Sequence, residues 1–264
     1  MMKIEHVGVT FNAGTPDENR ALRDVSLNVA KGDFVTVIGS NGAGKTTLYN
    51  AIAGTYAPTT GRILIRDIDV TKTPEYRRAR YIGRIFQNPL LGTAGKMSLE
   101  DNMVICNKKG YKGLGISLNS RLREYFRSRL RELDMGLENR LSDNVEQFSG
   151  GQRQALTLLM AVLSEPDLLL LDEHTAALDP RNAEIVMALT RSFAQRYNLT
   201  VMMITHNMSH AIEYGNRLLM MDSGEIVLDI GSEEKSKLTI DGIVTRFRDI
   251  KRRELSNDQM LLQV

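Results

Sequence analysis

The chain has 264 residues, of which 42% are hydrophobic and 25% charged, and its formal net charge at pH 7 is +2. This balance is typical of a folded globular protein and excludes the disordered and collagen-like classes, and the small net charge gives no support to a nucleic-acid partner. The lone Cys106 excludes an internal disulfide framework and fits a reducing compartment. No segment reaches the roughly 18 to 20 apolar residues of a membrane span, and residues 1–6 contain no apolar h-region. We expect one large α/β domain or two lobes.

Short alternating runs open the chain. Residues 3–10 and 21–29 alternate apolar and polar positions across a loop containing Gly and Pro, which predicts a hairpin. The apolar run 34–38 predicts a buried strand, and the helix after it is expected to end at Gly54. Further strands are predicted at 62–65 and 81–86, so strands and helices alternate and a mainly parallel sheet is expected.

A glycine-rich segment between the strand 34–38 and the following helix fits the phosphate-binding loop pattern at every required position. Its residues are Gly39, Ser40, Asn41, Gly42, Ala43, Gly44, Lys45 and Thr46. The glycines let successive N–H groups point at phosphates, where the helix adds its positive end. Lys45 would reach the β- and γ-phosphates, and the hydroxyl of Thr46 would bind Mg²⁺. A chance glycine turn is the alternative, and the strand-loop-helix context argues against it.

From about residue 90 to residue 163 the pattern becomes helical, with a capping signal at 98–101 and apolar residues at helical spacing in 120–133. We interpret this segment as a helical lobe inserted into the α/β core. Five arginines spread around one predicted helix with glutamates between them, which favours a solvated face over a nucleic-acid surface. They are Arg121, Arg123, Arg127, Arg129 and Arg131.

Four leucines at 168–171 predict a buried strand that ends in Asp172 and Glu173, and the run 199–204 predicts another. Ionised carboxylates beside a buried strand are costly unless a cation, a partner or water compensates. Nucleotide-bound Mg²⁺ would compensate, and in phosphate-loop ATPases such an aspartate holds the metal while a neighbouring acid polarises water. The pattern therefore assigns Asp172 to Mg²⁺ and Glu173 to general-base work. Two merely exposed carboxylates are the alternative.

A third motif, Phe148 followed by Ser149, Gly150, Gly151 and Gln152, precedes a strong helical run. A serine and two glycines at a helix start present free N–H donors, which makes a second anion-binding terminus. Taken alone, an ordinary helix cap is an equal alternative.

The order of these motifs resembles the ATP-binding cassette family over residues 1 to 228. The six motifs are the phosphate loop, Gln87, the 149–152 segment, the strand 168–171 with its two acids, the 177–179 segment and Thr205-His206. The resemblance implies that Gln87 links the nucleotide metal to the lobe that touches the membrane subunit. It implies that residues 149–152 cap the nucleotide of the other protomer, that Asp179 lies at the dimer seam and that His206 contacts the γ-phosphate.

Three sets of site residues are therefore expected. The catalytic set is Lys45, Gln87, Glu173 and His206, and the metal set is Thr46, Gln87 and Asp172. The nucleotide set is Phe11, Gly39, Ser40, Asn41, Gly42, Ala43, Gly44, Lys45, Thr46, Thr47, Ser149, Gly150, Gly151, Gln152 and Asp179.

The chain departs from the family pattern at three positions. Phe148 stands where the family usually has leucine, which leaves the donor groups of the motif intact. Phe11 stands at the adenine-stacking position, usually tyrosine, and a phenyl face can stack equally well. Core packing of Phe11 remains an alternative. His174 follows the catalytic acid where many members carry proline.

The resemblance implies a RecA-like core with an N-terminal antiparallel subdomain and an inserted helical subdomain. The expected domains are a core lobe at 1–88 and 165–228, a helical subdomain at about 89–164 and a C-terminal extension of packed helices at 229–264. For residues 230–264 a regulatory tail is the alternative. The implied cofactors are ATP and Mg²⁺. The implied partners are a second ATPase subunit in a head-to-tail homodimer, transmembrane permease subunits and, indirectly, a substrate-binding lipoprotein.

The implied function is that of the ATPase subunit of a bacterial transporter, bound to the cytoplasmic face of the membrane. Segments 86–94 and 172–180 resemble a subgroup associated with lipoprotein-dependent importers, for which tryptophan or tyrosine is the proposed solute. An exporter ATPase and a nucleotide-sensing module without transport remain alternatives, although Glu173 and His206 argue against the second. A DNA-repair relative would need a long coiled coil, and a translation-associated one would need two cassettes.

Overall fold

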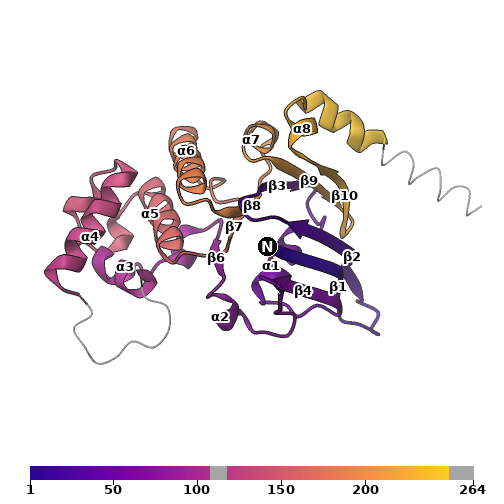
Figure 1. Ribbon diagram of the computed structural model, residues 1–264, viewed down its shortest axis with the longest axis horizontal. Helices are drawn as coiled ribbons and strands as arrows, with labels where there is room; N and C mark the ends of the chain where they lie inside the picture. The colour runs from indigo at the N-terminus through magenta and orange to yellow at the C-terminus, as the bar shows by residue number, and fades with distance from the viewer. Residues whose placement is uncertain (108–117, 250–264) are drawn as a thin grey trace, which may run out of the picture.

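The computed structural model describes residues 1–107 and 118–249, and Figure 1 shows their arrangement. The predicted N-terminal hairpin is confirmed, because β1 (Met2–Phe11) pairs antiparallel with β2 (Asn19–Val29). With β4 (Thr60–Ile65) and β5 (Ile68–Asp69) they form a four-stranded sheet of order β2-β1-β4-β5. Register shifts within β1 mark bulges that bend this sheet.

A second, six-stranded sheet forms the centre of the molecule, and its order is β10-β9-β3-β8-β7-β6. Its strands are β3 (Phe34–Gly39), β6 (Ile82–Ile85), β7 (Leu168–Asp172), β8 (Thr200–Ile204), β9 (Arg217–Asp222) and β10 (Glu225–Ile230). All neighbours are parallel except β9 and β10, so the predicted mainly parallel sheet is confirmed. Because β10 ends at Ile230, this sheet continues past residue 228, where the predicted C-terminal extension begins.

The four consecutive leucines of β7 are explained by cover on both faces of the central sheet. Leu169 and Leu171 belong to a core shared with the helical lobe and α6 (Pro180–Arg196). Leu168 and Leu170 belong to a second core, shared with the antiparallel sheet and α1 (Lys45–Ala53). A strand buried on both faces has no polar side, so its sequence is continuously apolar.

The predicted helical lobe lies at one end of the molecule, on the left of Figure 1. Its described elements are η1 (Pro89–Gly92), α3 (Leu99–Asn107), α4 (Ser120–Leu130), η2 (Arg131–Leu133), η3 (Leu137–Asn139), η4 (Val145–Gln147) and α5 (Gly150–Leu163). The capping signal before α3 is confirmed, because the Ser98 hydroxyl accepts a hydrogen bond from the Asp101 N–H at 3.1 Å. On α4, Arg123 bonds Glu100 and Arg127 bonds Glu124, as expected for a solvated face.

The C-terminal part combines a hairpin with short helices. After α7 (Met208–Glu213), β9 and β10 lead into α8 (Ser232–Lys235) and a further helix over 240–249. The remainder of the predicted packed-helix extension, residues 250–264, lies outside the described residues. No helix within residues 1–107 and 118–249 has the length and apolar character needed to cross a membrane.

A buried arginine joins α1 to α2 (Glu75–Arg78). Only 1% of Arg78 is exposed, and its guanidinium donates to four backbone carbonyl oxygens. Nη1 contacts Ala51 O at 2.7 Å and Ile52 O at 2.8 Å, Nε contacts Thr73 O at 2.7 Å and Nη2 contacts Thr71 O at 2.9 Å. The two bonds from Nη1 satisfy carbonyls at the end of α1 that have no partner within the helix. They therefore fix the far end of the helix that begins at the phosphate loop.

We predict that Arg78→Met lowers the free energy of unfolding by about 3 kcal/mol, since it leaves buried carbonyls without donors. The melting temperature measured by circular dichroism should fall by about 6 to 12 °C. Arg77→Met, at an exposed neighbour on α2, is the matched control and should melt like the parent protein. Equal melting of the two variants would contradict this role of Arg78.

Candidate functional site

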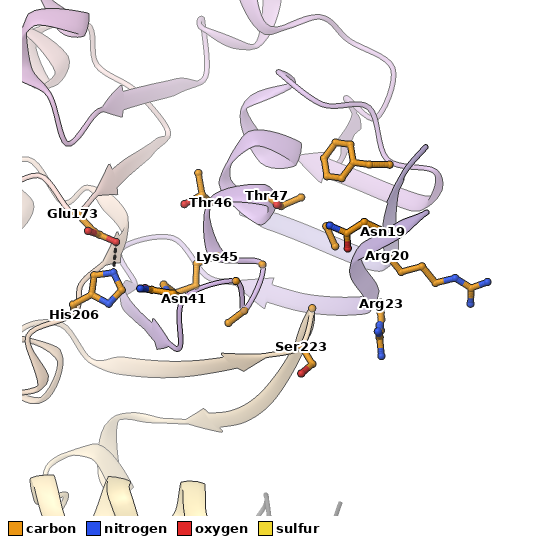
Figure 2. Close-up of a pocket in the computed structure, with 16 residues that line it drawn as sticks. Asn19, Arg20, Arg23, Asn41, Lys45, Thr46, Thr47, Glu173, His206 and Ser223 are labelled. Carbon is orange, nitrogen blue, oxygen red and sulfur yellow. Dashed lines mark ion pairs between the residues drawn. The ribbon is translucent and has the colours of Figure 1, made fainter. Parts of the chain in front are cut away.

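A cleft of about 620 Å³ opens at the carboxyl ends of β3, β7 and β8, and Figure 2 shows the side chains around it. Elements far apart in the sequence supply its walls: β1 and β2, the phosphate loop with the start of α1, the ends of β7 and β8, and the β9–β10 turn. The lining residues are Phe11, Asn19, Arg20, Ala21, Arg23, Asn41, Gly42, Ala43, Gly44, Lys45, Thr46, Thr47, Glu173, His206, Ser223 and Gly224. Parallel strands that end at one edge of a sheet place their following loops side by side, which is why these segments meet here.

The phosphate loop has the strained backbone that its glycines permit. Gly39, Gly42 and Gly44 have φ values of 151°, 82° and 94°, which side chains rarely tolerate. At Gly39 a Cβ atom would lie 2.2 Å from the carbonyl oxygen of Met221, so this position also has no room for a side chain. The loop is therefore held directly against β9.

Lys45 is the first residue of α1 and is 6% exposed. Its ammonium donates to the carbonyl oxygens of Gly39 at 2.8 Å and Ser40 at 2.9 Å. Burial lowers its pKa, while the nearby carboxylates of Glu173 and Asp172 act to raise it. Lys45 therefore presents a desolvated cation inside the loop, and phosphate oxygens would interact favourably with it.

Glu173 and His206 meet across the edge of the sheet. Asp172 at the end of β7 stands opposite Ile204 at the end of β8, so the residues that follow the two strands come together. His206 Nε2 lies 2.5 Å from Glu173 Oε1, the dashed line in Figure 2. Glu173 has φ 48° and its N–H bonds Ile204 O at 3.2 Å. A strained backbone held by neighbouring bonds is typical of functional positions.

Asp172, the last residue of β7, directly precedes Glu173. Burial raises its pKa, and the charge of Glu173 acts in the same direction. The positive charges of Arg84, Lys45 and His206 oppose this effect. The raised pKa shows that the surrounding cations only partly offset the cost of burying this carboxylate.

Phe11 forms part of the cleft wall and also packs against the core. Its ring meets that of Tyr56 edge to face, with centroids 5.2 Å apart and an interplanar angle of 82°. The position is compatible with both interpretations offered by the sequence, core packing and contact with a ligand.

The sequence analysis did not predict the lining residues from β2 and from the β9–β10 turn. Arg23 and Gly224 belong to these segments, and the Arg23 N–H bonds Gly224 O at 2.9 Å. The Gly224 N–H in turn bonds Ala43 O at 3.1 Å, and Ser40 Oγ lies 3.3 Å from an oxygen of the buried Asp222. No local sequence pattern predicts these contacts, because they depend on how β9 and β10 pair beside β3.

The 149–152 motif and Asp179 do not line the cleft. Ser149 caps α5 in a capping box, in which its hydroxyl accepts from the Gln152 N–H and the Gln152 side chain accepts from the Ser149 N–H. Asp179 caps α6 and accepts from the Asn182 N–H at 3.1 Å. Gly151 packs against Asn182, where a Cβ would lie 2.6 Å from the side-chain oxygen. These two helix starts therefore adjoin each other rather than the phosphate loop.

Two further positions singled out in the sequence are Gln87 and His174. Gln87 is exposed just beyond β6 and does not line the cleft. His174 is 2% exposed, and its Nε2 lies 3.1 Å from the Thr190 hydroxyl. Burial lowers its pKa to about 4, so this histidine is neutral at physiological pH.

Comparison with known proteins places these features in one family. The family model described as "ABC transporter" matches residues 22–176. The chain is 38% identical to the tyrosine transport ATP-binding protein of Clostridioides difficile, over 94% of the chain and 98% of that protein. It is 31% identical to a methionine import ATP-binding protein of Streptococcus agalactiae, over 92% of the chain and 69% of that protein.

A solved structure of an ATP-binding cassette gives the same fold. That protein, a dimer in a post-hydrolysis state bound to ADP and phosphate, is 27% identical and superposes with a TM-score of 0.71. The alignment covers 88% of the chain and 98% of the solved cassette. The predicted phosphate-loop fold, with its antiparallel subdomain, is confirmed.

We predict that Asp172→Asn raises the melting temperature of the nucleotide-free protein at pH 7. Because the pKa of Asp172 is raised on folding, the folded chain holds this proton more tightly than the unfolded chain. Stability is therefore lost as the pH rises from the ordinary aspartate pKa through the raised one. The melting temperature should rise by about 2 to 4 °C for each kcal/mol by which the substitution increases the free energy of unfolding.

Circular dichroism melts at several pH values test this expectation. The difference between Asp172→Asn and the parent should be largest at neutral pH and should shrink under acid conditions, where both states are protonated. Asp17→Asn, at an exposed loop position, is the control and should change little at any pH. A lower melting temperature for Asp172→Asn at pH 7 would contradict the expected cost of burial.

Proposed function

The chain belongs to the ATP-binding cassette family of transporter ATPases, whose members bind and hydrolyse ATP, and we propose that it drives a bacterial importer. In this proposal two copies associate head to tail around two ATP molecules and act on separate transmembrane subunits. The observation that carries the ATPase part of this proposal is the meeting of Lys45, Glu173 and His206 at one cleft beside the phosphate loop.

The residues that would contact the nucleotide have proposed roles that follow from their chemistry. The loop N–H groups and Lys45 bind the β- and γ-phosphates. Phe11 stacks on the adenine, with Tyr56 supporting its ring. Thr47 and Asn41 complete the wall around the phosphates.

Hydrolysis requires a base beside the γ-phosphate, and Glu173 is the carboxylate at that place. It orients a water molecule and takes its proton as the water oxygen attacks the γ-phosphorus. The bond from the γ-phosphorus to the bridging oxygen breaks, and ADP leaves. His206, already in contact with Glu173, holds the carboxylate and donates to the phosphate.

The donor set fits Mg²⁺ held jointly by protein and nucleotide. Among residues 1–107 and 118–249, no group of three or more His, Cys, Asp and Glu side chains is placed to hold a metal ion. Mg²⁺ commonly binds through one or two carboxylates together with substrate phosphates, so the protein need not supply a complete cage. Thr46 and Asp172 would hold it, together with Gln87. The ion would neutralise charge that develops on the phosphates.

Dimerisation is proposed because the second anion-binding helix start lies away from the cleft. The N-terminus of α5 carries Ser149 and two glycines, yet none of them lines the cleft that contains Lys45. If both segments bind nucleotide, each chain must supply its Ser149 terminus to a neighbour, which gives two-fold symmetry and two shared sites. Asp179, whose helix start adjoins Gly151 through Asn182, would then lie at the same interface.

The helical lobe carries exposed apolar side chains that suit a membrane-subunit partner. Leu90 and Leu91 on η1 are 50% and 68% exposed, and Met97 and Ile105 nearby in the chain are also exposed. Exposed apolar side chains are typical of interaction sites, and these four belong to one stretch of the helical lobe, residues 90–105. Gln87, just before η1, would connect this surface to the nucleotide. We propose that the permease docks here, which places the chain at the cytoplasmic face of the membrane.

The importer direction and the solute rest on similarity alone. Relatives named for tyrosine transport and methionine import match nearly the whole chain. We propose an aromatic amino acid, tyrosine or tryptophan, delivered by a substrate-binding lipoprotein.

We predict that Glu173→Gln binds ATP with near-normal affinity but hydrolyses it at least about a hundredfold more slowly, because the general base is lost. Retained ATP should hold the two protomers together, so sedimentation with ATP should detect dimer. Glu225→Gln, at an exposed position on β10, is the matched control and should keep normal turnover. Undiminished turnover in Glu173→Gln would remove Glu173 from this role.

Reconstitution with its transmembrane permease subunits tests direction and solute. Proteoliposomes containing internal ATP and supplied with the external binding lipoprotein should accumulate radiolabelled tyrosine or tryptophan. Lys45→Ala should abolish accumulation. Export of solute driven by ATP would contradict the importer assignment, and accumulation of methionine alone would contradict the aromatic solute.

A further inference from the structure

The segment after β10 packs directly against α7, the helix that follows His206. Ile243 from this segment shares a small apolar core with Ile230, the last residue of β10, with Ile38 on β3 and with Ala211 on α7. Leu238 and Phe247 pack against the same core. The helix α7 is therefore enclosed between the central sheet and the C-terminal segment.

A buried lysine adds polar contacts to this packing. Lys235, the last residue of α8, is 3% exposed. Its ammonium donates to Tyr214 O, to Gly215 O at 3.1 Å and to Thr36 Oγ1 at 3.3 Å. Three N–H groups thus have three acceptors, as a buried ammonium requires. Burial lowers the pKa of Lys235 to about 8, so the amine keeps its third proton at neutral pH.

The acceptors of Lys235 lie just after α7, the helix that follows His206, and on β3, the strand that precedes the phosphate loop. Tyr214 is the C-cap residue of α7, and a cation near the last carbonyls of a helix is favourable. Thr36 lies on β3, three residues before Gly39 of the phosphate loop, and is completely buried. Its hydroxyl lies 2.9 Å from Ala211 O on α7 and donates to it, which leaves its oxygen free to accept from Lys235.

The position of α7 determines the position of His206. Asn207 caps α7 by accepting from the His210 N–H at 3.1 Å, and its own N–H bonds the Thr205 hydroxyl. His206 lies between these two anchored residues, so a shift of α7 would move its imidazole relative to Glu173. A contact of 2.5 Å between their side chains tolerates little displacement.

We infer that the segment after β10 positions His206 for ATP hydrolysis and that Lys235 is the positioning residue, an inference that rests on the proposed role of His206. Lys235 touches neither nucleotide nor reacting atoms. It acts by joining the end of α7 to β3. This connection keeps His206, which would contact the γ-phosphate, in a fixed position relative to the phosphate loop. The C-terminal segment thereby becomes part of the ATPase machinery rather than a separate packing element.

A mutant cycle between Lys235 and His206 tests this inference. Lys235→Met keeps a straight side chain and removes the ammonium. It should lower kcat about fivefold while leaving the KM for ATP within about twofold, since the phosphate loop itself is unchanged. Lys237→Met, an exposed neighbour whose ammonium lies 3.5 Å from Glu233, is the matched control and should keep the parent kcat.

Single-turnover rates with excess protein and labelled ATP extend the test to the slow His206→Ala background. There Lys235→Met should cause no further loss, because its effect passes through His206. An unchanged kcat in the single variant, or the same fractional loss in the His206→Ala background, would overturn the inference. Normal turnover of His206→Ala alone would instead refute the proposed role of His206.

A second pair of variants covers the case in which Lys235→Met does not fold. Thr36→Val removes the hydroxyl while keeping the shape, and Thr36→Ser keeps the hydroxyl. Thr36→Val should lower kcat in the same direction as Lys235→Met, without further loss when His206 is absent, and Thr36→Ser should restore it. Equal kcat for Thr36→Val and the parent would contradict the inference.

Discussion

Two carboxylates at the end of a buried strand impose the main electrostatic constraint on this site. Asp172 loses solvation because β7 lies between β8 and β6 in a sheet covered on both faces, and its pKa rises as a result. Lys45, Arg84 and His206 offset part of this cost, and each comes from a different element. The sheet order that puts β3 beside β8 and β8 beside β7 is therefore a requirement of the chemistry as well as of the packing. A nucleotide would meet the positive and negative groups already converging at one edge.

The parts of the site that are local in sequence could be predicted, whereas the parts that depend on tertiary pairing could not. The loop from Gly39 to Thr46 directly follows a predicted strand and leads into a helix, and the carboxylates follow a run of leucines that a doubly covered strand explains. Arg23 and Gly224 reach the cleft only because the β9–β10 turn bonds the loop at Ala43. Nothing in the sequence around these residues distinguishes them from ordinary strand and turn positions.

The burial of two charged side chains could not be predicted from the sequence either. Arg78 and Lys235 lie in short, highly charged helical segments that would be interpreted as solvent-exposed, yet they are 1% and 3% exposed. Both donate to carbonyl groups near helix ends, α1 in one case and α7 in the other. Such a role depends on which carbonyls another part of the chain leaves without donors. These two helices begin at the phosphate loop and just after His206. Both buried charges therefore stabilise helices whose first residues adjoin the candidate site.

Within a single chain the start of α5 lies away from the cleft that contains Lys45, and mixing two inactive variants tests most directly whether a second chain brings the two segments together. Lys45→Ala disables the phosphate loop and Ser149→Arg blocks the start of α5, so each variant alone should lack ATPase activity. Subunit exchange between them creates mixed dimers with one intact composite site, and the mixture should regain up to about a quarter of the parent activity. Full activity of the Ser149→Arg variant alone, or no recovery in a mixture shown to contain mixed dimers, would contradict a site shared between two chains.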